Sequence, residues 1–141
     1  MTSTPGATGA GGGAPQLLDD ACSLATNEEI SSASGATIAQ AVASPSSCTW
    51  NDGSGALVAN VTWIGGDAGE ATWQGMQNEA MGGVEVSGIG DEALWINNTT
   101  SLAVRKGEGV LNIGVALTLG DEPARRDIAE KIGRIVAPRA P

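Results

Sequence analysis

The sequence predicts an α+β fold: a single antiparallel sheet of five to six strands, packed by two to three helices mainly on one face. Segments of alternating apolar residues follow one another across short glycine-rich turns, which is the pattern of antiparallel hairpins. Segments with helical periodicity occur between them without alternating one for one with the strands. The chain has 141 residues, 41% of them hydrophobic, which is enough for one core.

The first helix is predicted from its capping residues, shortly after the folded part begins at Leu17. Thr26 is a good N-cap, and Glu29 three residues later completes a capping box. The helix is expected to end at Gly35, since glycine is common just beyond a helix C-terminus. Residues 36–44 fit a strand and a coil equally well.

Two strands are expected next. Residues 48–51 form the first, and Asp52-Gly53-Ser54-Gly55 is a strong turn signal. Residues 56–63 alternate, so Leu57, Ala59, Val61 and Trp63 are predicted to share one face of this strand. The other face is predicted to carry Val58, Asn60 and Thr62.

A second helix is expected over residues 67–81, with Asp67 as its cap. Its helical spacing places Trp73 and Met76 on one side. A short strand over residues 84–86 should follow.

The next segment contains a glycine-rich loop, Gly88-Ile89-Gly90-Asp91, followed by a hairpin. The hairpin strands are expected over residues 92–97 and 101–106. Residues 110–119 are predicted to form the longest strand, with its apolar odd-numbered residues on one face.

The last helix is predicted to follow Asp121, which is a good N-cap, and to run to Val136. Ile128 and Ile132 belong to its buried stripe, and the intervening charged residues should face solvent.

Residues 1–16 are rich in Gly, Ala, Thr and Pro and are predicted to form a flexible tether that cannot bury a core. They lack the basic start and the apolar stretch of a signal peptide. Such tethers follow the lipidated cysteine of bacterial lipoproteins, so Met1 is interpreted as standing at or near that removed cysteine. A plain disordered N-terminus is the alternative. We expect the folded domain over residues 17–137 and a frayed tail over 138–141.

The net charge of −9 is unevenly distributed. Residues 1–104 contain eleven acidic residues and no Lys or Arg, and all seven basic residues lie at or after Arg105. Nucleic-acid binding needs a basic face, so no nucleic-acid partner is expected. Contact with a membrane is expected only through a lipid anchor. The simplest role of the acidity is solubility.

Cys22 and Cys48 are the only two cysteines, and the chain has no histidine. A disulfide that closes the Ser- and Ala-rich segment between them would stabilise the fold by roughly 3.5 kcal/mol on the chain-entropy model. It would also indicate a location outside the cytosol. Two separate buried thiols are the alternative. Two cysteines without a histidine leave too few zinc ligands, so neither a metal nor another cofactor is expected.

Catalysis is difficult to build from this composition, because histidine is the usual acid or base near neutral pH. We therefore expect no enzyme. Asp91 and Glu92 are the most tempting carboxylates, but neighbours on a strand point to opposite faces. Asp91 is better explained as an acceptor for backbone N–H groups in its turn. A carboxylate-only hydrolase would need two carboxylates facing each other across a cleft.

The candidate binding residues are Trp95 and Arg105, with Gly88, Gly90 and Asp91 from the preceding loop. If helices cover only one face of the sheet, an open face carrying Trp95 and Arg105 would suit a protein partner or a small apolar ligand. The alternative places Trp95 in the core.

Several motifs, in this order and spacing, resemble a group of small uncharacterised lipoproteins common in actinobacteria, a domain-of-unknown-function family. They are Cys22 before a short helix, Cys48 beside Trp50, the GxGDxAxW element of residues 88–95, the strand and Lys-Gly turn of residues 104–107, and the helix of residues 122–136. The resemblance covers roughly residues 17–137. It implies export, a disulfide and a surface-anchored domain, and it brings no activity.

The sequence therefore favours a non-catalytic, exported, lipid-anchored binding domain of the cell envelope, whose ligand or partner is unknown. The alternative is an accessory or structural subunit that stabilises another envelope protein. A carboxylate-only hydrolase is the third possibility.

Overall fold

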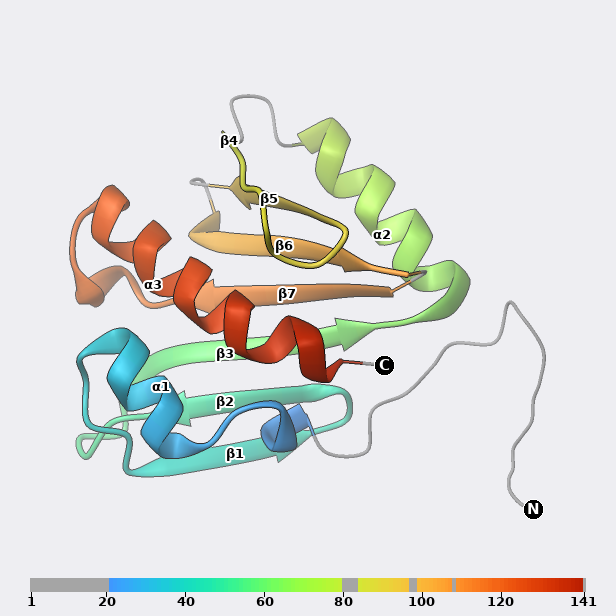
Figure 1. Ribbon diagram of the computed structural model, residues 1–141. Helices are drawn as coiled ribbons and strands as arrows, with labels where there is room; N and C mark the ends of the chain where they lie inside the picture. Colours follow the sequence, from blue (N-terminus) through green and yellow to red (C-terminus); the bar gives the residue numbers. More distant parts are fainter. Residues whose placement is uncertain (1–20, 80–83, 97–98, 108, 141) are drawn as a thin grey trace, which may run out of the picture.

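The computed structural model describes residues 21–79, 84–96, 99–107 and 109–140 (Figure 1). These residues form an α+β fold, with one antiparallel sheet of seven strands in the order β1-β2-β3-β7-β6-β5-β4. The predicted fold class is confirmed. The sheet exceeds the five to six expected strands because part of the ambiguous segment 36–44 pairs as β1.

The elements below are numbered in chain order, and η marks a 3-10 helix. They are η1 (Ala21–Leu24), α1 (Asn27–Ser34), β1 (Gln40–Ser44), β2 (Ser47–Asn51), β3 (Leu57–Ile64), α2 (Gly66–Glu79), β4 (Val84–Glu85), β5 (Glu92–Ile96), β6 (Ser101–Lys106), β7 (Gly109–Val115), η3 (Leu117–Leu119), α3 (Glu122–Val136) and η4 (Ala137–Arg139).

The predicted caps of α1 and α3 are confirmed, whereas the prediction that Asp67 caps the second helix is wrong, because α2 begins one residue earlier, at Gly66. Thr26 accepts a hydrogen bond from the Glu29 backbone N–H at 3.1 Å, and the Glu29 carboxylate accepts one from the Thr26 N–H at 2.9 Å. Gly35 ends α1 in the left-handed conformation, with φ of 76°. Asp121 caps α3 by accepting from the Ala124 N–H at 3.1 Å. These four-residue patterns are local, so the sequence alone determines them.

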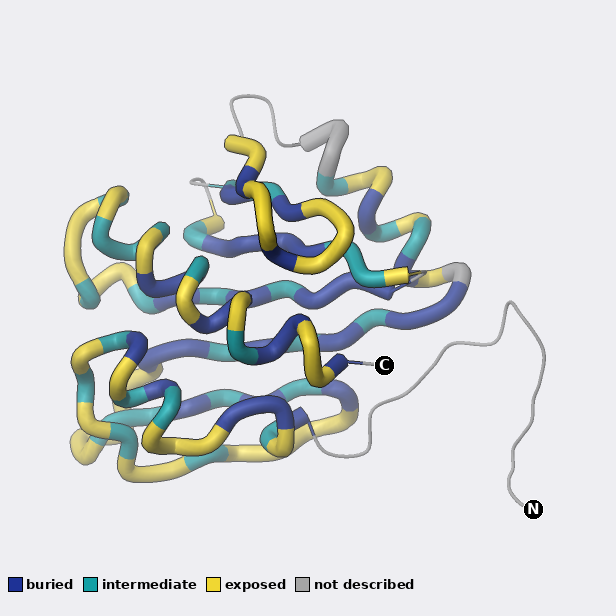
Figure 2. Tube along the Cα trace, in the orientation of Figure 1, coloured by how far each residue is buried: buried dark blue, intermediate teal, exposed yellow. Residues whose placement is uncertain are grey.

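Helices α1 and α3 cover one face of the sheet, and the main core lies between these helices and that face (Figure 1). Trp50, Trp63 and Trp95 are all buried there. Helix α2 packs on the opposite face, where Trp73 joins a smaller cluster with Ala103 and Val110. Two of the three α-helices therefore share one face, as expected, and α2 covers part of the other. Figure 2 shows the central strands buried and β1 largely exposed.

A β-bulge changes the predicted pattern at the start of β3. Trp50 pairs with Ala59, but Asn51 pairs with Leu57, so the register skips Val58. Val58 is 2% exposed and belongs to the main core, whereas Leu57 is 43% exposed. The prediction that Leu57 shares a face with Ala59, and that Val58 lies on the other face, is therefore wrong, because one extra residue in a strand shifts the alternation.

Strand β7 ends earlier than predicted. It stops at Val115, and Leu117–Leu119 form a 3-10 helix in which Leu117 is 68% exposed. On one side β6 begins at Ser101, which pairs with Gly114, so β6 does not extend past the end of β7. On the other side the last pair with β3 joins Ala59 to Val115, and the bulge at Val58 follows directly. Beyond Val115 the β6 side offers no strand for pairing, so the chain turns instead.

The segment after α3 is ordered rather than frayed. Residues 137–139 form η4, and Ala140 is buried. The Lys106 ammonium donates to the carbonyl oxygens of Ala137 and Ala140 at 2.6 and 2.7 Å. The expected frayed tail is therefore wrong for residues 138–140. The predicted tether of residues 1–16 lies outside the described residues.

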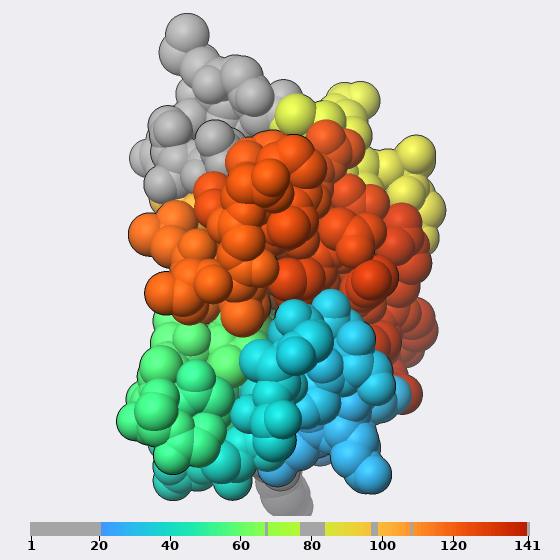
Figure 3. Space-filling model, turned by 90° about the vertical axis from the view of Figure 1, so that its left-hand side faces the viewer, coloured from blue at the N-terminus to red at the C-terminus, as the bar shows by residue number. Residues whose placement is uncertain are grey.

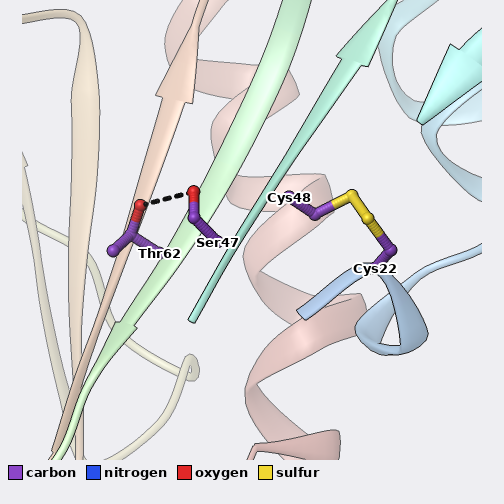
Figure 4. Close-up of a disulfide and its surroundings, with 4 residues drawn as sticks. All are labelled: Cys22, Ser47, Cys48 and Thr62. Atoms are coloured by element: carbon purple, nitrogen blue, oxygen red, sulfur yellow. Dashed lines mark hydrogen bonds between the residues drawn. A yellow bond between two sulfur atoms is a disulfide. The ribbon is translucent and has the colours of Figure 1, made fainter. Parts of the chain in front are cut away.

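The predicted disulfide is present between Cys22 and Cys48 (Figure 4). It joins η1 to β2 on the face that carries the main core, where Cys48 is fully buried. The neighbouring Ser47 points to the opposite face, and its hydroxyl lies 3.2 Å from that of Thr62 on β3. In the part of the chain that the structure describes, no helix is long and apolar enough to span a membrane.

Candidate functional site

The glycine-rich loop between β4 and β5 is held by the core beneath it. Ile89 is 2% exposed and belongs to the main core. Gly90 has φ of 59°, and a Cβ atom there would collide with Val104 and with the carbonyl oxygen of Arg105. The turn therefore requires glycine at this position, and Gly90 serves the fold of the loop.

Asp91 fastens this loop to the neighbouring hairpin. Its backbone N–H donates to the Arg105 carbonyl oxygen at 2.8 Å, and its Oδ2 accepts from the Gly107 N–H at 2.7 Å. The prediction that Asp91 accepts a backbone N–H is confirmed. The donor is in the β6–β7 turn rather than in the loop of Asp91 itself.

The structure does not bring Trp95 and Arg105 together. Trp95 on β5 pairs with Leu102 on β6, whereas Arg105, three residues after Leu102, pairs with Glu92. Alternation then places Trp95 and Arg105 on opposite faces of the sheet. Trp95 is 1% exposed in the main core. The expected open face carrying both residues is therefore not formed, and the core alternative for Trp95 is correct.

Arg105 links α2 to the sheet on the other face. Its Nη2 lies 2.8 Å from Oε2 of Glu70 on α2, and its Nη1 lies 3.5 Å from Oε2 of Glu92 on β5. About a third of the Arg105 side chain remains exposed. The single positive charge of Arg105 is therefore shared by two carboxylates, and the three groups together carry a net negative charge.

Beside this ion pair lies a hollow of about 360 Å³ between α2 and the β4–β5 region, which we call the acidic hollow. Three carboxylates line it, from Glu85, Asp91 and Glu92. The remaining lining residues are Trp73, Val86, Ser87, Ala93 and Leu94. The hollow thus combines an apolar wall with several acids, and Asp91 is the predicted site residue that reaches it.

The carboxylates of the acidic hollow are incompletely neutralised. Within the described ranges, neither Glu85 nor Asp91 forms an ion pair, and Glu92 has only its 3.5 Å contact with the shared Arg105. Among those same residues, no group of three or more His, Cys, Asp or Glu side chains is arranged to hold a metal ion. The acids are therefore distributed around the hollow rather than gathered on one point.

A second hollow, of about 300 Å³, lies on the other side of the same loop. It is lined by Gly88, Gly90 and Asp91 from the loop and by basic residues, Lys106 and Arg134. Lys106 already donates to two carbonyl oxygens near the end of α3, and Arg134 pairs with Glu130 at 3.2 Å. These bases are thus occupied in holding the fold.

A furrow between α1 and α3 has a volume of about 510 Å³, more than either hollow beside the GIGD loop. Figure 3 shows the two helices side by side on this face. Ala33 and Ile135 give it an apolar lining. Most of its charged rim is paired within the chain, since Glu29 binds Arg139, Lys131 binds Asp127, and Arg134 binds Glu130. Among the described residues, Glu28 is the rim residue without an ion pair. The furrow therefore offers less uncompensated charge than the acidic hollow.

Comparisons with protein-family models, curated proteins and solved structures gave no match. The site is consequently interpreted from its own geometry. Sequence reasoning missed Trp73 and Glu85 as lining residues, and it set Glu92 aside. The sequence signal for this hollow was the acidic residues on both sides of the GIGD loop. The contribution of Trp73 could not be found in this way, because the approach of α2 to that loop is a tertiary contact.

Proposed function

We propose that this protein is a non-catalytic binding domain of the cell envelope, exported and held by a lipid anchor on the N-terminal side of residue 17. We further propose that it binds a small organic cation with an apolar part. The observation that carries this proposal is the acidic hollow, with three carboxylates around a wall that contains Trp73 and Leu94.

The chemistry of the hollow favours a cationic ligand. Small-molecule sites are mostly apolar concavities with a few polar groups that fix orientation. Here Leu94, backed by the buried Trp73 and Val86, supplies the apolar contact, and the carboxylates supply the charge. The surrounding chain adds to this field, since residues 1–104 contain eleven acids and no Lys or Arg. A surface of one sign raises the local concentration of ligands of the opposite sign.

Binding explains the carboxylates better than hydrolysis does. A glycosidase needs one carboxylic acid to give a proton and a second carboxylate to act as nucleophile or base. Asp91 already accepts the Gly107 N–H at 2.7 Å, and Glu92 shares Arg105 with Glu70. Both carboxylates therefore already take part in contacts that hold the fold.

The Cys22–Cys48 disulfide supports the exported location. Structural disulfides persist in oxidising compartments and are rare in the cytosol. The lipid anchor rests on the tether-like composition of residues 1–16 and on the resemblance to small lipoproteins.

The cation proposal is tested by titrating the protein with benzyltrimethylammonium, benzyl alcohol and benzoate, which share a ring and differ in charge. The expected result is that only the cation shifts the NMR signals of Val86, Leu94 and the Trp73 indole, and that added salt weakens its binding. Equal binding of benzyl alcohol would show that the carboxylates do not select the ligand and would overturn the proposal.

Two variants make the test specific. Glu85→Gln removes one charge from the hollow and should weaken binding of the cation several-fold. Glu122→Gln removes the same charge at the start of α3, outside the hollow, and should leave binding unchanged. Equal weakening by both variants would point to net charge alone and would contradict a site at the hollow.

Native mass spectrometry on protein released gently from its own envelope tests the wider function. A bound basic compound of a few hundred daltons, on a chain two hydrogens lighter than the reduced form, is the expected result. A tight protein partner without such a compound would instead favour the accessory-subunit alternative.

A further inference from the structure

The two edges of the sheet differ in a way that bears on association. Strand β4 forms one edge, and it has two residues, one of which is Glu85. Strand β1 forms the other, with five residues of sequence QAVAS that carry neither charge nor proline. Natural proteins blunt their edges with short strands, charges or proline, because an unpaired edge accepts another strand. By these criteria β4 is protected and β1 is not.

The neutrality of the β1 edge extends well beyond the strand. Residues 30–51, which include β1 and β2, contain no charged residue in a chain of net charge −9. On the face away from the disulfide, Val42 is opposite Thr49, and Ser44 is opposite Ser47. Val42 is 42% exposed. This end of the molecule is therefore where two copies of an acidic protein can approach with the least repulsion.

The β1 edge is also held rigid. Ala43 pairs with Cys48, whose disulfide to Cys22 fixes the neighbouring strand. The turn that follows β1 is held by a hydrogen bond from the Trp63 N–H to the Ser46 carbonyl oxygen at 2.8 Å. A preformed edge loses little conformational freedom when another strand binds, which favours association.

We propose that β1 is a self-association edge, on which β1 of a second copy pairs in antiparallel orientation and joins the two sheets. A two-fold arrangement uses the same strand from both copies and is therefore closed. The outer edge of β1 has no neighbouring strand among the described residues. Another extended strand can form hydrogen bonds with the unpaired backbone groups of such an edge. Because the edge carries no charge, a second copy of this protein is favoured over a charged partner.

The size of the contact predicts the strength of the dimer. A pair of five-residue strands buries less area than the ~1,200 Å² typical of stable interfaces, so the dimer should be weak and depend on concentration. Each copy carries −9, so added salt should strengthen the dimer by screening the repulsion between the remaining surfaces. This salt dependence is opposite to that expected for the cation site.

Sedimentation velocity on the full chain tests the proposal with two matched variants. Val42→Lys places a charge on β1, and Val84→Lys places the same charge on β4, where Val84 is 39% exposed. Wild type and Val84→Lys should form a dimer that strengthens with salt, and Val42→Lys should dimerise at least tenfold more weakly. A wild-type monomer up to millimolar concentration, or equal effects of the two variants, would overturn the proposal.

Amide hydrogen exchange supplies an independent readout. The β1 amides should exchange faster in dilute protein than in concentrated protein, while the β4 amides should not depend on concentration. Protection of all β1 amides in dilute monomer would show that the edge is already covered, and would also overturn the proposal. Neither outcome affects the acidic hollow, so the two proposals can fail separately.

Discussion

Arg139 and Glu29, separated by 110 positions in the sequence, form a two-point ion pair. The distances are 2.7 Å from Nη1 to Oε1 and 2.8 Å from Nη2 to Oε2. The same Nη1 donates to the carbonyl oxygen of Leu24 at 3.0 Å. Because Glu29 also closes the capping box with Thr26, this contact ties the segment after α3 to the start of α1.

The first prediction concerns the strength of this ion pair. Arg139→Ala should lower the melting temperature more than Lys131→Ala does, because the Lys131–Asp127 pair is a single contact between largely exposed side chains on one helix. Arg139→Lys should restore only part of the loss, since an ammonium cannot form the two-point contact. Thermal unfolding followed by circular dichroism measures this, and equal melting temperatures for the two alanine variants would contradict it.

The same contact predicts a pH dependence. The hydrogen bond from Arg139, followed by that from the Thr26 backbone, lowers the pKa of Glu29 from its usual 4.5 to about 2. A carboxyl group whose pKa is lower in the folded than in the unfolded protein stabilises the fold above the unfolded value. That contribution is lost as the pH falls from 4.5 towards 2. Hydrogen bonds from Ser54 and Ala56 likewise lower the pKa of Asp52, so its contribution is lost in acid too.

Urea unfolding between pH 2 and pH 7 checks this dependence. Stability should fall below pH 4.5 in the wild type, and Arg139→Ala should fall less steeply because its Glu29 has lost the main cause of the shift. Parallel pH profiles for the two proteins would show that Arg139 does not lower the pKa of Glu29.

Local patterns in the sequence predicted much of the fold. The capping box of Thr26 and Glu29, the Asp121 cap and the Asp52 turn all involve residues within four positions of one another, so no tertiary contact is needed to form them. The bulge at Val58 was missed because it depends on how β3 aligns with β2. The end of β7 was missed for a similar reason, since it depends on how β7 aligns with β6 and β3.

The candidate site was harder to predict because it depends on the register of a hairpin. The strands expected over residues 92–97 and 101–106 do pair, as β5 (Glu92–Ile96) and β6 (Ser101–Lys106), and residue 97 lies outside the described residues. The length of the turn decides which residues share a face. The observed register places Arg105 with Glu92, and therefore opposite Trp95. The approach of Trp73 to the GIGD loop depends on how α2 crosses the sheet, which no short motif encodes.

A third prediction concerns the disulfide between Cys22 and Cys48, which lie 26 positions apart. Reduction should lower the free energy of unfolding by about 3.5 kcal/mol on the chain-entropy model, because the unfolded chain gains freedom. The double variant Cys22→Ala, Cys48→Ala should show a similar loss and should no longer respond to reductant. Urea unfolding with and without reductant measures both, and a wild type indifferent to reductant would contradict the prediction.

The last prediction compares two glycines whose surroundings are opposite. The ring of Trp63 lies against Gly109 at the start of β7, so that a Cβ atom there would collide with three ring atoms. Gly75 lies within α2, where a Cβ atom would meet nothing within 4 Å. Gly109→Ala should destabilise the protein by about 1–3 kcal/mol, since Trp63 is 2% exposed and has little room to move.

Gly75→Ala should instead stabilise the protein by up to about 1 kcal/mol, because alanine has the higher helix propensity. The two variants add the same methyl group, so stability changes of opposite sign would be due to the packing of Trp63 against β7. The free energy of unfolding in urea is the measurement, and near-ultraviolet circular dichroism should change only for Gly109→Ala. A neutral Gly109→Ala variant would show that the ring does not lie against the strand.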